Sequence, residues 1–133
     1  RALTSDYPKL SNDVGMSSSP VVTNGVLVIQ AEAPSESYLF GIDSETGTTL
    51  WKLARPRSMN WSSPIVMQAD SEHPWVLVTS GNGLQGLEPK TGQTLFSFEG
   101  DVSTIPSSVG AGDRFLATLD GLSAFQVGSR GAE

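Results

Sequence analysis

Two stretches of matching sequence decide the fold: GIDSETGTTLW at residues 41–51 and GLEPKTGQTLF at residues 86–96. Both run glycine, an acidic residue, Thr-Gly, Thr-Leu and an aromatic residue, and the second follows the first by 45 positions. Upstream, SSPVV at 18–22 matches SSPIV at 62–66, and VLVI at 26–29 matches VLVT at 76–79. A repeat of this length predicts a fold built from identical supersecondary units.

Each unit contains four short apolar runs separated by turn residues. The predicted strands of the first unit are 19–23, 26–31, 37–43 and 48–53, and those of the second are 63–68, 75–80, 84–88 and 93–98. A weaker third copy, FLATLDGLSAFQ, covers residues 115–126. Four strands in about 40–45 residues are typical of β-propeller blades. We therefore expect an all-β chain of about three blades, each a four-stranded antiparallel sheet, in an incomplete ring.

The repeat boundaries divide the chain into four parts. Residues 1–16 form an N-terminal segment that could include the tail of a preceding blade, 17–61 form blade 1, 62–105 form blade 2, and 106–133 form a partial blade 3. The polar, glycine-rich sequence after residue 126 predicts that blade 3 lacks its outer strand. The first residue is Arg rather than Met, so we expect a processed chain or a part of a longer one.

The stretch GNGLQG at residues 81–86 has the G-x-G-x-x-G spacing of a dinucleotide-binding loop. That site needs a helix after the glycines, but Pro89 and Gly92 follow here, without apolar residues at helical spacing. We interpret the stretch as a hairpin turn and the start of a strand. Asn82-Gly83, like Asp120-Gly121 in the third copy, is a dipeptide that tolerates the positive φ of a tight turn.

Composition excludes several classes of function. The net charge is −6, with eight Lys and Arg against fourteen Asp and Glu, which disfavours nucleic-acid binding and an anionic membrane surface. Cysteine is absent, which excludes thiol catalysis, disulfides and cysteine-ligated metals. No apolar run reaches the roughly 18 residues of a membrane span.

The repeated motif resembles the A-x-D-x-x-T-G-x-x-x-W tryptophan-docking motif of pyrroloquinoline-quinone-type β-propeller repeats. The first copy has Gly where the family usually has Ala, and the second replaces Asp and Trp by Glu and Phe. The third copy starts at Ala124 and does not complete the motif. The motif residues are Gly41, Asp43, Thr46, Gly47 and Trp51 in the first copy and Gly86, Glu88, Thr91, Gly92 and Phe96 in the second.

These residue types suit an inter-blade turn. The carboxylate can accept backbone N–H bonds, and the Thr-Gly glycine can adopt a left-handed conformation. The aromatic ring would return over a neighbouring blade, with Gly41 or Gly86 leaving room for it, and burying such a ring contributes about 2–3 kcal/mol. Because a propeller ring needs at least four blades, we expect further blades, other copies of the chain or a protein partner to close it.

The resemblance implies three functions. The preferred one is a non-catalytic protein-interaction scaffold of the bacterial cell envelope or periplasm, like the BamB-like members of the family, without a cofactor. The second is a segment of a pyrroloquinoline-quinone-dependent alcohol or sugar dehydrogenase, which would use the quinone and calcium. The third is a secreted propeller associated with a polymer or sugar.

Few residues outside the motif suggest chemistry. Asp43 and Glu45 could be oxygen ligands for calcium but fit turn positions better. His73, the single histidine, lies in the insertion QADSEHP and is expected to be a solvated loop residue. The stretch ARPRSMNW at 54–61 carries Arg55, Arg57 and Trp61, which could bind a carboxylate or peptide of a partner. The alternative is an inter-blade connection whose tryptophan packs inward.

Overall fold

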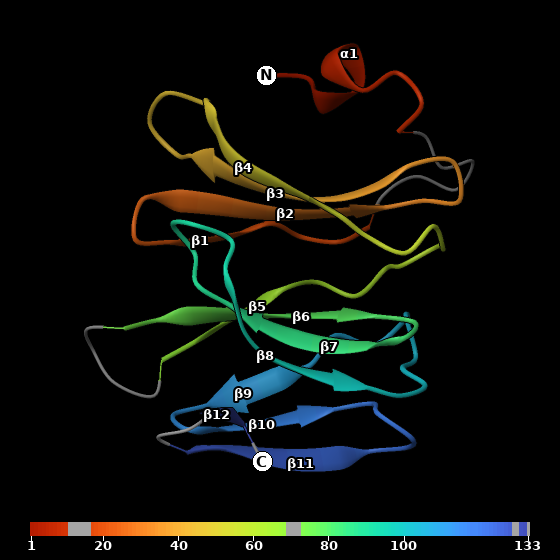
Figure 1. Cartoon of the computed structure of the whole chain (residues 1–133), viewed down its shortest axis with the longest axis vertical. Coiled ribbons are helices and arrows are strands. Elements are labelled where there is room, and N and C mark those ends of the chain that lie inside the picture. Colours follow the sequence, from red (N-terminus) through yellow and green to blue (C-terminus); the bar gives the residue numbers. More distant parts are fainter. Residues whose placement is uncertain (11–16, 69–72, 129–130, 133) are drawn as a thin grey trace.

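The computed structural model describes residues 1–10, 17–68, 73–128 and 131–132. Three antiparallel sheets are stacked face to face along the long axis of the molecule (Figure 1). Within each sheet the strands are neighbours in chain order. The first sheet contains β1 (Val21–Thr23), β2 (Val26–Glu32), β3 (Ser37–Asp43) and β4 (Thr49–Ala54); the second contains β5 (Ile65–Met67), β6 (Trp75–Ser80), β7 (Gly83–Leu87) and β8 (Thr94–Glu99).

The third sheet is the least regular of the three. It contains β9 (Val109–Ala111), β10 (Arg114–Ala117) and β11 (Ser123–Gly128), and the two-residue β12 (Gly131–Ala132) pairs with the end of β11. The outer strand is therefore shortened rather than missing. The predicted all-β fold of about three four-stranded blades in an open arc is confirmed.

Residues 1–10 lie against the free side of the first sheet. They contain α1 (Leu3–Asp6), a single helical turn, and not a strand of another blade. Buried Leu10 packs with Ala31, Phe40 and Ile42 of the first sheet. The rest of the predicted N-terminal segment, 11–16, lies outside the described residues. No helix in the described part of the chain is long and apolar enough to cross a bilayer.

The hairpin turns follow the expected residue types with one correction. Asp120 and Gly121 both have positive φ, 50° and 109°. At the other predicted dipeptide only Gly83 does (φ 151°), because the two-residue loop is Gly81-Asn82 and Gly83 is already paired with Ser80. A Cβ at Gly83 would clash with the carbonyl oxygen of Phe98, so close approach of β8 also requires a glycine there.

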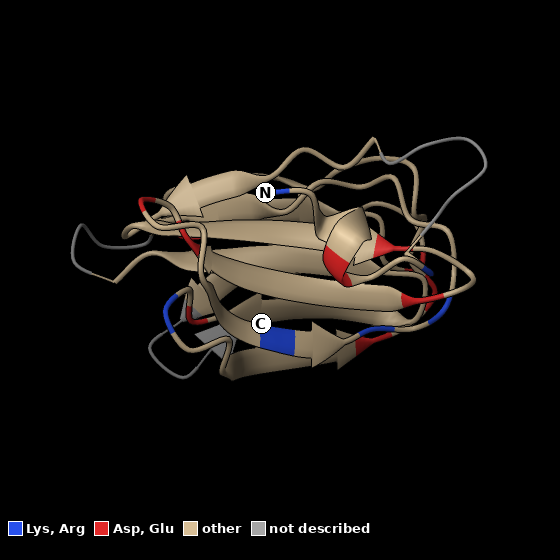
Figure 2. Ribbon diagram, turned by 90° about the horizontal axis from the view of Figure 1, so that it is seen from above, with Lys and Arg blue, Asp and Glu red and all other residues tan. Residues whose placement is uncertain are grey.

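Two apolar cores hold the sheets together. Between the first and second sheets, Val26, Val28 and Leu39 meet Val76, Val78 and Leu87. Between the second and third, the core is largely aromatic, with Trp75, Phe96, Phe98, Phe115 and Phe125 in mutual ring contact. Most charged residues lie on loops and strand ends at the periphery of the stack (Figure 2). The second sheet thus has two buried faces, as expected for a propeller blade.

Candidate functional site

The acid-to-glycine turns of the first two sheets have the same geometry. Oδ1 of Asp43 accepts the backbone N–H and the hydroxyl of Thr46 at 2.7 and 2.8 Å. Oε2 of Glu88 accepts the same two groups of Thr91, both at 2.7 Å. Gly47 and Gly92 close the two turns with φ of 71° and 72°. The longer glutamate replaces aspartate here without a change in the turn.

Hydrogen bonding in these turns favours the ionised carboxylates. The backbone N–H and hydroxyl of Thr46 hold the pKa of Asp43 below its ordinary value of 3.8. Partial burial raises the pKa of Glu88, but hydrogen bonds from Thr91 and Lys90 outweigh it and leave the pKa below 4.5. Because Asp43 Oδ1 is committed to the turn, it is a poor candidate for a calcium ligand. The described residues contain no group of three or more Asp, Glu, His or Cys side chains that could hold a metal ion.

The motif aromatic residues lie at the junctions between sheets. The half-buried ring of Trp51 covers Gly41, where a Cβ would clash with the indole. Its Nε1 donates to the carbonyl of Pro89 in the second sheet at 2.8 Å. Phe96, also half-buried, covers Gly86 in the same way and contacts Trp75 edge to face, with 5.1 Å between ring centroids. Both positions thus require glycine, because any larger side chain would clash with the aromatic ring of the neighbouring outer strand.

A buried polar cluster connects the first and second sheets. The carboxylate of Glu32, at the end of β2, is fully buried and pairs with Nε of Arg55 at 2.9 Å. Ser80 and Gln30 also donate to its Oε1, at 2.6 and 3.1 Å. Asn60 donates to its Oε2 at 2.9 Å. The carboxylate therefore accepts from four side chains, which offsets much of its desolvation.

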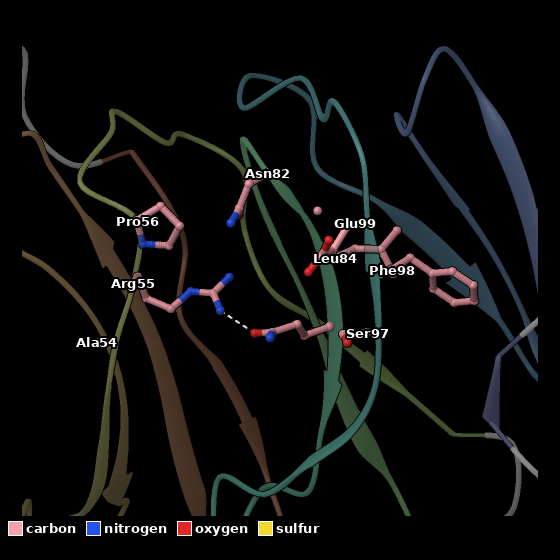
Figure 3. A pocket seen from close by; sticks show the side chains of 10 residues that line it. Ala54, Arg55, Pro56, Asn82, Leu84, Ser97, Phe98 and Glu99 are labelled. Carbon is pink, nitrogen blue, oxygen red and sulfur yellow. Dashed lines mark hydrogen bonds between the residues drawn. The ribbon is translucent and has the colours of Figure 1, made fainter.

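Arg55 extends this cluster into the second sheet. Its guanidinium donates to Ser80 Oγ at 2.6 Å and to Oε1 of Gln85, so three of its donors are used inside the chain. Arg55 and Gln85 also line a hollow of about 230 Å³, together with the end of β4, the turn before β7, the start of β7 and β8 (Figure 3). The guanidinium and Glu32 neutralise each other, so this hollow lacks the excess positive charge that would attract an anion.

The three residues predicted as a partner contact do not share one environment. The side chain of Arg55 is 7% exposed and belongs to the polar cluster, whereas Arg57 is exposed. Trp61 is half-buried, and its backbone N–H donates to the carbonyl of Thr104 at 2.8 Å. His73 is exposed, as expected.

The polar cluster was missed by the sequence reasoning, although a signal existed. Gln30 and Glu32 alternate with apolar residues in β2, in phase with Val26 and Val28, which puts all four on one buried face. Comparison of the two copies does not indicate the cluster. By strand register, the position of Arg55 in the first sheet is occupied by Gly100 in the second. The cluster is therefore specific to the junction of the first and second sheets.

The face of the third sheet that points away from the second is not covered by another sheet, and it carries exposed apolar side chains beside Arg114 and Gln126. We call the face of each sheet that points toward the next one along the chain its forward face. Strand register defines one row across it: Val21, Val28 and Gly41 in the first sheet, Ile65, Leu77 and Gly86 in the second, and Val109, Leu116 and Ala124 in the third. Val28 and Leu77 are 0% and 1% exposed, but Leu116 is 41% exposed.

Other apolar side chains of the third sheet are also exposed. Val109, which pairs with Leu116, is 62% exposed, and Leu122, in the bend before β11, is 75% exposed. Val109 and Leu116 also line a shallow hollow of about 350 Å³ on this face. The third sheet thus presents an apolar surface at the positions that form the inner junctions.

No model of a protein family matches the chain, and no curated protein sequence matches it. Solved structures do. A europium-containing methanol dehydrogenase matches with a TM-score of 0.64 and 14% identity over 89% of this chain and 24% of that one. BamB from Moraxella catarrhalis matches with a TM-score of 0.61 and 15% identity over 85% of this chain and 34% of that one.

The chain spans a quarter to a third of the length of these two structures. Both are β-propeller proteins, and the match extends over most of the three stacked sheets described here. At this level of identity the likeness concerns the fold alone. The chain has the fold of about three blades of a β-propeller, as in these two structures.

Proposed function

We propose that the chain is a non-catalytic β-propeller segment that acts as a protein-interaction scaffold, with the forward face of the third sheet as its main docking surface. The observation that carries the proposal is the 41% exposure of Leu116, because Val28 and Leu77, at the same place in the strand register, are buried in both other sheets. Soluble proteins seldom leave contiguous apolar patches of this kind uncovered.

The proposed occupant is another four-stranded sheet of the same kind, supplied by further blades, a second copy or a protein partner. At the inner junctions, the forward face is covered by valine, leucine and phenylalanine side chains of the following sheet, such as Val76 and Phe115. An occupant with a similar apolar sheet face would bury Leu116 and its neighbour Val109 in the same way. Apolar burial contributes about 25 cal/mol per Å².

A role in the bacterial cell envelope is part of this proposal. It is supported by the resemblance of the repeat motif to BamB-like proteins and by the similarity of the fold to BamB itself. The predicted partner contact at Arg57 also stays a proposal, since its side chain is exposed on the connection that follows β4.

Light scattering of the purified chain tests the docking surface. We expect the wild-type chain to self-associate or to bind a partner, and the double variant Val109→Asp/Leu116→Asp to be monomeric. Leu95→Asp is the matched control, because Leu95 is 50% exposed on the outer strand β8 and away from this face. A wild-type chain that is a monodisperse monomer with cooperative unfolding and no partner would refute the proposal.

The competing function is a segment of a quinone-dependent dehydrogenase, because one similar structure is a methanol dehydrogenase. Adding pyrroloquinoline quinone and calcium to the chain distinguishes the two. A non-catalytic scaffold leaves the absorbance spectrum of the quinone unchanged, whereas a saturable spectral shift would favour the dehydrogenase.

A further inference from the structure

The hollow beside Arg55 lies at the outer edge of the junction between the first and second sheets. Its volume is about 230 Å³, and its walls come from the end of β4, the turn before β7, the start of β7 and β8. The strands β4 and β8 are the last of their sheets, at the edge opposite β1 and β5. The hollow is smaller than the sites of about 300–1,000 Å³ that hold drug-sized ligands, so it suits a molecule of about one small ring.

The hollow is lined by hydrogen-bond donors that the protein leaves unused. Arginine has five N–H groups, and those of Arg55 donate once each to Glu32, Gln85 and Ser80. The other two, and both N–H groups of the Gln85 side-chain amide, have no acceptor among the described residues. The Arg55 side chain is only 7% exposed, and its three bonds fix the guanidinium. These donors are therefore held in place before any ligand binds.

The opposite wall supplies acceptors. Asn82, Ser97 and Glu99 are exposed, and their side chains form no hydrogen bond with other described residues. In Figure 3, Arg55 enters the hollow from the side of β4, and Asn82 and Glu99 point toward the same space from the second sheet. A ligand between these walls can accept from Arg55 and donate to Glu99.

The charges around the hollow favour a neutral, polar ligand. Glu32 neutralises Arg55, so an anion would gain little from the guanidinium and would face the carboxylate of Glu99. A cation would face the guanidinium. An apolar ligand would cover the Arg55 N–H groups without giving them acceptors, which is unfavourable. Adjacent hydroxyls suit both walls, because each hydroxyl can accept and donate.

We propose that this hollow, the hydroxyl pocket, binds one ring of a sugar, either as a free monosaccharide or as the last residue of a polysaccharide. Adjacent ring hydroxyls accept from Arg55 and Gln85 and donate to the carboxylate of Glu99. Asn82 and Ser97 lie at the rim, where they bond the remaining hydroxyls.

The pocket gives a physical reason for the buried ion pair beside it. Such a pair often adds no stability over apolar side chains of similar size, and the core between the second and third sheets is largely aromatic instead. Glu32 holds the guanidinium of Arg55 in one orientation, and preorganisation of this kind lowers the cost of binding a ligand. Because the pocket does not involve the third sheet, the inference is independent of the docking surface proposed there.

Titration of sugars into the ¹⁵N-labelled full chain tests the pocket. The chain carries Val109→Asp/Leu116→Asp, which removes association through the third sheet. For at least one of D-glucose, D-galactose and D-mannose, we expect saturable chemical-shift changes at Asn82, Gln85 and Glu99. Cyclohexanol, a ring with a single hydroxyl, should bind about tenfold more weakly, because it cannot bond to both walls at once.

Methyl glycosides of the same sugars distinguish the two sources, since their blocked anomeric oxygen mimics the linkage to a polysaccharide. A glycoside that binds as tightly as its free sugar indicates the end of a polymer, and a glycoside that does not bind indicates a free monosaccharide. The inference is overturned by the absence of saturable changes with all three sugars, by tighter binding of glycine than of every sugar, or by changes scattered over all three sheets.

Two matched pairs of variants locate the binding. Glu99→Gln should weaken it about tenfold, because a carboxylate accepts stronger hydrogen bonds than an amide, whereas Glu45→Gln, at an exposed residue of the turn before β4, should not. Ser97→Phe should fill the pocket and abolish binding, whereas Leu95→Phe, at another exposed position of β8, should not. Urea midpoints close to that of the parent chain verify that the variants are folded. Equal binding by the two members of each pair would also overturn the inference.

Discussion

Replacing Arg55 by methionine should destabilise the junction of the first and second sheets strongly. The substitution keeps most of the apolar stem but removes the charge that pairs with buried Glu32 at 2.9 Å. Removing one partner of a buried ion pair costs about 3–5 kcal/mol, because the other charge remains buried. Glu32 keeps three donors, from Ser80, Gln30 and Asn60, so we expect the lower end, about 3 kcal/mol.

Urea unfolding followed by tryptophan fluorescence measures this effect. With a slope of about 2 kcal/mol per molar urea, the midpoint should fall by about 1.5 M. Arg57→Met is the matched control, since Arg57 is exposed two residues away and surface changes usually stay within about 0.5 kcal/mol.

A double-mutant cycle with Glu32→Gln refines the test. The double variant should cost less than the sum of the two single variants, because each single variant leaves an unpaired partner. Unfolding free energies of the Arg55 and Arg57 variants that agree within about 0.5 kcal/mol would refute the reasoning, and so would strict additivity in the cycle.

Three further predictions concern the repeated motif and the hairpin between β6 and β7. Trp51→Ala should lower the unfolding free energy by about 3 kcal/mol in urea denaturation, whereas Leu50→Ala, on the exposed side of β4, should leave it within about 0.5 kcal/mol. Because the folded-state pKa values of Asp43 and Glu88 are lowered, their contribution to stability is present above the ordinary values of 3.8 and 4.5 and is lost as the pH falls below them. In the variant Asp43→Asn/Glu88→Gln the urea midpoint should therefore fall less between pH 6 and pH 3 than in the wild-type chain, a range of about three units around those values. A midpoint that falls as much as in the wild-type chain would contradict the turn geometry. Gly83→Ala should lower the melting temperature measurably, since its Cβ would clash with the Phe98 carbonyl; an unchanged melting temperature would contradict that approach.

The sequence by itself determined the sheets and their turns. Strand order, the acid-to-glycine turns and the glycines under Trp51 and Phe96 all follow from local signals that recur every 44–45 positions in the motif and the SSP starts. Alternation of side chains and turn chemistry act over a few residues, so the repeat could be interpreted without knowledge of how the sheets pack. The predicted starts and ends of β2, β3 and β6 differ from the structure by at most one residue.

Only the tertiary structure decided which sheet faces meet and what remains uncovered. Glu32 and Arg55 are 23 positions apart and meet Ser80 and Gln85 only because the first sheet stacks on the second. This cluster breaks the repeat, so comparing the copies could not reveal it. The apolar hollow between residues 1–10 and the first sheet likewise depends on how that segment packs on the sheet. Contacts between sheets are set by the geometry of stacking, which no local pattern in the sequence encodes.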